Sequence, residues 1–167
     1  MYSHTKKAII LALILIITPQ VSFAKTTKHQ PKQESEKLCL AKAIYHEAKG
    51  EPIVGKKGVA KVVLNRKDHK NFPKSICKVV NQVDYHEGKK LCQFSWVCGK
   101  PKIDIKSDSW EDAKVLSDSI LTNKISLPDF GPDVLFFKSV HSRQRFGRGY
   151  RLVSRLGNSN FYSKKIT

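Results

Sequence analysis

Along this chain the spacing of apolar residues changes from a helical period to a strand-like one, and this change limits the fold more than any other feature of the sequence. Between Leu38 and Lys49, apolar residues recur three and four positions apart, which predicts an amphipathic helix. Gly50 follows where helices commonly end, and Pro52 suits the first turn of a second helix that we expect to reach Lys67.

The second helix should turn an apolar face to the core and a basic face to solvent. The residues expected to point inward are Val59, Val62, Val63 and Leu64, and those expected to point outward are Lys56, Lys57 and Lys61. A third helix is predicted over residues 107–121. Asp108 and Glu111 have the spacing of an N-cap and its reciprocal partner, and apolar residues follow at helical spacing.

Short segments of strand character follow or interrupt these helices. They are Gln93–Val97 and, beyond Pro132, Val134–Lys138, Arg151–Arg155 and Phe161–Ser163, with turns at Gly147, Gly149 and Gly157. Helices therefore come first and short strands later. This order predicts an α+β domain with a small antiparallel sheet, because a parallel sheet would need strands and helices that alternate.

The N-terminus has the pattern of a removable secretory signal. A basic stretch, Met1–Lys7, precedes an almost unbroken apolar run of 11 residues, Ala8–Thr18, and small residues stand at Ser22 and Ala24. A membrane span would need roughly 20 apolar residues. We therefore expect residues 1–24 to be a signal peptide, and the protein to be exported to the periplasm, the cell wall or the medium.

Export leaves one basic domain. Residues 25–37 are polar and are expected to form a flexible leader, and residues 38–167 are expected to form a single folded domain, most simply a monomer. Without the signal the chain has 29 basic and 14 acidic residues, a net charge of +15. Such a charge indicates an anionic partner, and export makes an acidic wall polymer a better candidate than nucleic acid.

Four cysteines remain in the exported part: Cys39, Cys77, Cys92 and Cys98. An even number in an oxidising compartment favours two disulfides, and three pairings are possible. Zinc is the alternative, because His86 lies near two of the cysteines. The chain contains no C-x-x-C spacing, which zinc sites usually show, so we expect neither metal nor cofactor.

The residues around Glu47 are the most informative in the chain. His46-Glu47 could begin a zinc protease motif, but that motif needs a second histidine at the position of Gly50. Glu47 instead falls in the last turn of a helix, beside apolar residues. Burial and the negative end of the helix would both raise its pKa toward the range of a general acid. Periodicity alone favours the other interpretation, a solvated glutamate on the polar face.

Several motifs occur in an order that strongly resembles the SleB/CwlJ-type cell wall hydrolases. They are the run Cys39–Pro52, then Gly55, Val59-Ala60, Val62–Arg66, Phe72-Pro73, Ile76–Val80, Cys92–Trp96, Arg155–Asn158 and Phe161-Tyr162. The resemblance covers residues 38 to 163. It departs from the family where Ser159 follows Asn158, because family members often have histidine there.

The resemblance implies a lysozyme-like helical core with a small sheet, and cleavage of the glycan backbone of peptidoglycan by a lytic transglycosylase or muramidase. The first acid of the family's E-A-x-G-E motif is essential, and here it is Glu47. The resemblance further suggests residues for substrate binding: Tyr45, Glu51, Gln93, Ser95 and Trp96. Glu51 is better explained as a helix cap or hydrogen-bond acceptor than as a catalytic partner, and Asn65 and Arg66 as residues that hold the end of the second helix.

Two alternatives stay open from the sequence. The domain could bind peptidoglycan without cutting it, or it could be an N-acetylmuramoyl-L-alanine amidase. Such amidases usually need a zinc site, and the six histidines show no paired spacing. A glycosidase with two carboxylates would need a partner for Glu47, for which Asp84 and Asp104 are the remaining candidates.

Overall fold

The computed structural model describes residues 30–143 and 145–164, with side chains from Glu36 onward. The predicted signal peptide lies outside the described residues. Within them, no helix is long and apolar enough to cross a membrane. In chain order the elements are α1 (Gln30–Ala48), α2 (Ile53–Asp68), α3 (Ile76–Val80), β1 (Val83–His86), β2 (Lys89–Cys92), α4 (Ser95–Gly99), α5 (Asp108–Leu121), β3 (Val134–Ser139), β4 (Tyr150–Leu156) and β5 (Ser159–Lys164).

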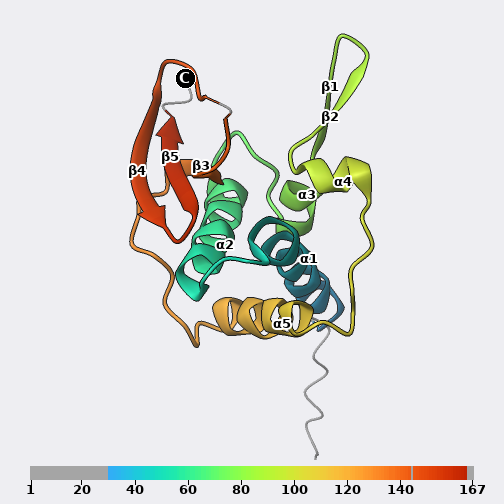
Figure 1. The fold of residues 1–167 in the computed structure, drawn as a ribbon. Helices are drawn as coiled ribbons and strands as arrows, with labels where there is room; N and C mark the ends of the chain where they lie inside the picture. The colour runs from blue at the N-terminus through green and yellow to red at the C-terminus, as the bar shows by residue number, and fades with distance from the viewer. Residues whose placement is uncertain (1–29, 144, 165–167) are drawn as a thin grey trace, which may run out of the picture.

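Helix α1 is the centre of the fold and packs against α2, α3 and α5 (Figure 1). Its predicted apolar face is confirmed, since Ala41, Ile44 and Ala48 are buried, although Leu38 is exposed. The sheet β3–β5 and the hairpin β1–β2 both project on the side of the helices away from α5 (Figure 1). The α+β prediction is confirmed.

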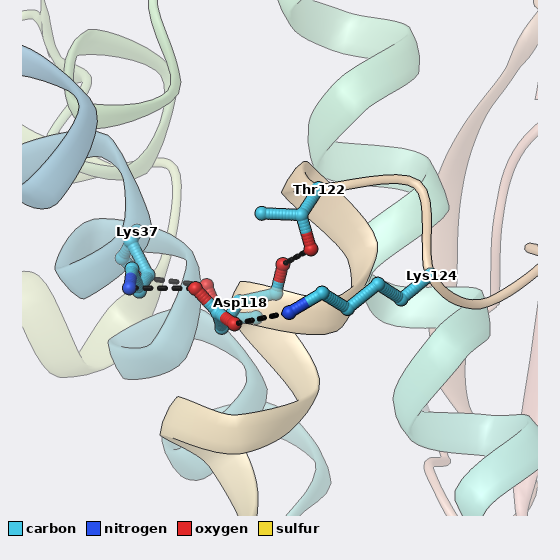
Figure 2. A network of polar contacts seen from close by, with 5 residues as sticks. Lys37, Asp118, Thr122 and Lys124 are labelled. Carbon is cyan, nitrogen blue, oxygen red and sulfur yellow. Dashed lines mark hydrogen bonds and ion pairs between the residues drawn. The ribbon is translucent and has the colours of Figure 1, made fainter.

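Helix α1 begins earlier than predicted. Residues 30–37, which we expected to belong to a flexible leader, are helical. The start of the described side chains is tied to the fold, because the Glu36 carboxylate accepts a hydrogen bond from the Ile76 backbone N–H at 2.6 Å and Lys37 pairs with Asp118 at 2.7 Å. Figure 2 shows Lys37 reaching Asp118 on α5, where Lys124 also approaches. A prediction that rests on the polarity of the local sequence cannot detect such tertiary contacts.

Helix α2 joins the helical core to the sheet. The predicted inward valines are fully buried, and Gly58 lets the helix meet the sheet, since a Cβ there would lie 2.4 Å from the ring of Phe161. The prediction of an outward basic face is wrong at Lys56. The side chain of Lys56 is only 13% exposed and lies 3.5 Å from the Asp112 carboxylate on α5, which packs close enough to cover it.

The last three strands form an antiparallel sheet in the order β3-β5-β4, which confirms the predicted strands. Phe161, the central apolar residue of β5, is fully buried between the sheet and α2. The tight turn from β4 to β5 contains Gly157, whose positive φ of +59° favours glycine.

The strand expected at Gln93–Val97 is wrong. Residues 95–99 form the short helix α4, and Cys92 is joined to Cys98 with their Cα atoms 5.8 Å apart. Six residues of extended chain would separate these atoms by roughly 20 Å. The strand pairing lies just before this segment instead, in the hairpin of β1 and β2.

The N-cap of α5 is Ser107 and not Asp108. Ser107 has an extended backbone, and its Oγ accepts a hydrogen bond from the Trp110 N–H at 3.3 Å. Asp108 is the first helical residue, where its charge favours the positive end of the helix dipole. Serine and aspartate are comparable caps, so the sequence did not separate them.

Candidate active site

All four cysteines form disulfides, which confirms the prediction of two disulfide bonds. One disulfide, Cys39–Cys77, joins α1 to α3, and the other, Cys92–Cys98, joins β2 to α4. The second holds the segment that carries Gln93 and Ser95 against the end of the hairpin. It therefore shapes one wall of a large cleft.

That cleft has a volume of about 690 Å³ and lies between the end of α1, the loop after β2, and the sheet. Polar and aromatic side chains line it together. The lining residues are Glu47, Ala48, Gly50, Glu51, Arg66, Cys92, Gln93, Phe94, Ser95, Phe136, Phe137, Lys138, Ser139, Phe146, Asn158 and Ser159.

Glu47 stands in the last turn of α1 and is half-buried in this cleft. Burial raises the pKa of its carboxyl, the direction expected from the sequence, while the Trp96 indole and the charge of Arg66 act against that rise. Trp96 Nε1 is buried and, among the described residues, has no partner within hydrogen-bond geometry. The indole thus lies near the carboxyl without completing a hydrogen bond. A carboxyl with a raised pKa can hold a proton and donate it inside the cleft.

Arg66 is a site residue that the sequence analysis missed. It is 3% exposed, its Nε donates to the Leu135 carbonyl at 2.8 Å, and burial lowers its pKa to about 10. With the Gln93 amide turned so that its oxygen faces the guanidinium, that oxygen accepts from both terminal nitrogens at 3.2 and 3.3 Å.

Three aromatic rings complete the surroundings of Arg66. Its guanidinium lies 5.3 to 5.8 Å from the ring centres of Phe72, Phe94 and Phe136. Such contacts hold a cation in a fixed place with little water around it. Arg66 therefore presents a fixed positive charge to the cleft. Helical periodicity could not reveal this, because an arginine normally marks a solvent-facing position.

Asn65 behaves as expected. Its Nδ2 donates to the carbonyls of Gly131 and Val134, both at 3.0 Å, and so fastens the end of α2 to the start of β3. Neighbouring residues of one motif thus have separate roles: one holds the scaffold, and the other lines the cleft.

Glu51 lines the cleft, but its carboxylate is already engaged by the β4–β5 turn. One oxygen accepts from the Asn158 backbone N–H at 2.7 Å, and the other accepts from Ser159 Oγ at 3.1 Å. Ser159, the residue at which the chain departs from the family pattern, thus supplies one of these bonds. The contacts support the interpretation of Glu51 as an acceptor that places the sheet against α1.

The remaining substrate-binding candidates separate into two groups. Gln93 and Ser95 line the cleft, as the resemblance suggested. Trp96 lies behind them and stacks on His46, with ring centres 4.4 Å apart. Tyr45 is 5% exposed and is not among the lining residues; its hydroxyl accepts from the Asp104 N–H at 3.3 Å. We therefore assign Tyr45 to the core.

The other acids considered as partners of Glu47 do not line the cleft. Asp84 lies on the exposed hairpin, and Asp104 is in the loop before α5. Among the described residues, the acids that line the cleft are Glu47 and Glu51. The same part of the chain contains no group of three or more His, Cys, Asp or Glu side chains that could hold a metal ion.

A protein-family model described as Cell Wall Hydrolase matches residues 50–162. The match begins three residues after Glu47, so the assignment of that residue depends on the geometry of the cleft. Among curated proteins, the spore cortex-lytic enzyme of Halalkalibacterium halodurans is 46% identical over 41 residues, which are 25% of this chain and 12% of that protein.

Two solved structures share the fold. The catalytic domain of the germination-specific lytic transglycosylase SleB from Bacillus anthracis is 20% identical, with a TM-score of 0.53 over 78% of this chain and 95% of that one. The catalytic domain of the Bacillus cereus SleB protein is 18% identical, with a TM-score of 0.51 over 78% and 91%. These likenesses confirm the architecture expected from the sequence.

Proposed function

Since the chain belongs to the cell wall hydrolase family, we propose that it cleaves the glycan strands of peptidoglycan as a lytic transglycosylase, with Glu47 as the acid and base. The family implies an extracellular or cell-wall location, and an export signal in residues 1–24 would take the protein there. The similar fold of a lytic transglycosylase makes this bond a better candidate than the amide cut by an amidase.

The proposal depends on one observation. The cleft contains Glu47, a carboxyl with a raised pKa, and the oxygens of its other lining acid, Glu51, already accept hydrogen bonds from the protein. A glycosidase that uses two carboxylates needs the second one free, as a nucleophile or as a base for water. Glu51 is held by Asn158 and Ser159, so Glu47 is left as the acid that can exchange a proton with a ligand.

One carboxyl suffices for a transglycosylase. Protonated Glu47 donates its proton to the glycosidic oxygen while the bond from that oxygen to the anomeric carbon of muramic acid breaks. The 6-hydroxyl of the same sugar then attacks the anomeric carbon, and the Glu47 carboxylate takes the hydroxyl proton. The products are a 1,6-anhydro end and a free hydroxyl end, and Glu47 regains its proton for the next cleavage.

Mass spectrometry of the products tests this proposal. Purified peptidoglycan treated with the protein is expected to release fragments with anhydromuramic ends. Reducing sugar ends would instead identify a muramidase, free stem peptides would identify an amidase, and unchanged strands would leave a binding module.

We predict that Glu51→Gln lowers the stability of the fold but has little effect on the rate of peptidoglycan cleavage. The amide oxygen can still accept from the Asn158 N–H, but its NH2 group can only donate to Ser159 Oγ, so one bond is reversed and both lose the strength of a charged acceptor, at about 1–3 kcal/mol in total. Thermal unfolding should occur at lower temperature, while peptidoglycan cleavage measured well below that temperature should continue. Loss of cleavage at an unchanged unfolding temperature would instead make Glu51 a catalytic partner.

We predict that Arg66→Gln moves the alkaline limit of activity to higher pH. The Arg66 cation lowers the pKa of Glu47, so the pKa should rise further without it. Activity needs the protonated acid and is lost as pH rises through that pKa, so the loss should occur at higher pH. The initial cleavage rate across pH measures this.

Arg66→Lys is the matched control, because it keeps a cation at the same position. Its alkaline limit should stay closer to that of the unmodified protein. A general fall in rate at every pH, with the same limit in both variants, would assign Arg66 to structure alone. Unfolding temperatures of both variants report any loss of stability separately.

A further inference from the structure

The sheet at the C-terminal end of the chain carries charge of one sign. Residues 134–164 contain seven lysines and arginines and no aspartate or glutamate. The five arginines are all exposed, and none takes part in an ion pair among the described residues. They are Arg143, Arg145, Arg148, Arg151 and Arg155. The hairpin β1–β2, on the other side of the cleft, carries two acids and two lysines.

Strand register assigns some of these cations to one face. Directly paired residues share a face, so Lys138, Asn160 and Arg155 form one row across the three strands. This face is turned away from α2, because Phe161, the next residue on β5, is the one that packs on Gly58. We refer to this side of the sheet as the outer face.

Aromatic rings and the exposed Leu152 occupy the rest of the outer face. Phe136 and Tyr162 form the next row, and Tyr150 lies opposite Lys164 in the row beyond. Phe146, from the β3–β4 connection, stacks on Tyr150 with ring centres 4.5 Å apart. These rings are half-buried and leave flat apolar surfaces among the cations.

The outer face is continuous with the cleft that holds Glu47. Phe136, Lys138 and Phe146 belong to the outer face and its covering ring, and all three line the cleft. A polymer seated at Glu47 that extends toward the sheet would therefore meet these rings and Lys138 first. Arg145 and Arg148 stand one and two residues from Phe146 in the sequence. Arg155 lies in the row of Lys138.

We propose that the outer face and the exposed arginines beside it bind the peptide-bearing part of the strand that is being cut, with the arginines pairing with carboxylates of the stem peptides. This inference rests on the proposed function and identifies the part of the substrate that is recognised. Guanidinium groups pair with carboxylates through two parallel hydrogen bonds, and rings beside them offer apolar contact to sugars and alkyl side chains.

Binding can be measured without cleavage by placing every variant in a Glu47→Gln background. One variant carries Arg145→Gln, Arg148→Gln and Arg155→Gln. A control removes the same charge outside the sheet, through Lys70→Gln, Lys102→Gln and Lys106→Gln, three exposed lysines that precede α5 in the chain. The probes are soluble glycan strands with their stem peptides, the same strands with the peptides removed, and vesicles containing an anionic phospholipid.

The arginine variant should bind peptide-bearing strands at least about tenfold more weakly than its parent, while the lysine control changes less than about twofold. The difference should shrink at 1 M salt, where charges are screened beyond about 3 Å. Strands without peptides should bind both variants alike. Equal losses in both variants, an equal loss on peptide-free strands, or a loss confined to the vesicles would overturn the proposal. Because no step requires cleavage, an inactive parent protein would contradict the proposed function and leave this test intact.

Discussion

Replacing Glu47 with glutamine is expected to reduce peptidoglycan cleavage by about 10²- to 10⁴-fold, the range associated with a general acid or base. Glutamine has nearly the same shape as glutamate and cannot donate or take a proton at neutral pH. The comparison is the rate at which the protein and the variant release anhydro-sugar ends. A variant that cleaves at the original rate would remove Glu47 from the mechanism.

The fold of this variant should be at least as stable as the parent at neutral pH. Burial raises the pKa of Glu47 in the folded protein, so stability falls as pH rises from the unfolded-state pKa to the folded pKa, and the full cost is present above the folded pKa. A neutral side chain removes that cost. The unfolding temperatures of the two proteins should therefore be equal or favour the variant, and should converge as pH falls and the glutamate becomes protonated.

Removing the Cys39–Cys77 disulfide by a double change to alanine is expected to cause the largest loss of stability of any change considered for this chain. The bond closes a segment with a sequence separation of 38, for which the chain-entropy estimate is about 4 kcal/mol. The unfolding temperature should fall by roughly 10–15 °C. Guanidinium unfolding gives the free energy directly.

The Cys92–Cys98 disulfide provides a matched comparison, because its sequence separation is only 6 and the same estimate gives about 2 kcal/mol. Its removal should instead disturb the cleft, since Cys92 lines it and the bond positions Gln93 and Ser95. We expect the first double variant to lose more stability and the second to lose more activity in proportion. The reverse order would contradict these assignments.

The structure indicates which of the many basic residues are available to contact an acidic polymer, which composition alone could not do. From the sequence, Lys56, Lys57 and Lys61 were expected to form a basic face turned to solvent, which would be free to contact an acidic polymer. Lys56 is largely covered and pairs with Asp112, so it is a poor candidate. The arginines of β4 and of the β3–β4 connection stay exposed, and the outer face that they accompany reaches the cleft through Phe136, Lys138 and Phe146, so the binding test addresses them.

Local sequence patterns were sufficient wherever a residue's environment depends on its near neighbours. The apolar period of α1, the glycine after it, and the alternating segments of the sheet specified these elements closely. They also placed Glu47 in the last turn of a helix beside apolar residues. Local patterns were less reliable at element ends, where Ser107 and Asp108 are equivalent caps.

Tertiary structure decided what depends on residues distant in sequence. Helix α1 begins at Gln30 because of contacts with α3 and α5, and α4 replaces the expected strand because of a disulfide. Arg66 is buried in the cleft because rings and a carbonyl from separate segments surround it. The sequence by itself thus predicted, through its resemblance to a family, that Glu47 is the carboxyl that acts as the acid. Only the folded chain decided that the Glu51 carboxylate is held by Asn158 and Ser159, because these residues lie 107 and 108 positions away in the sequence.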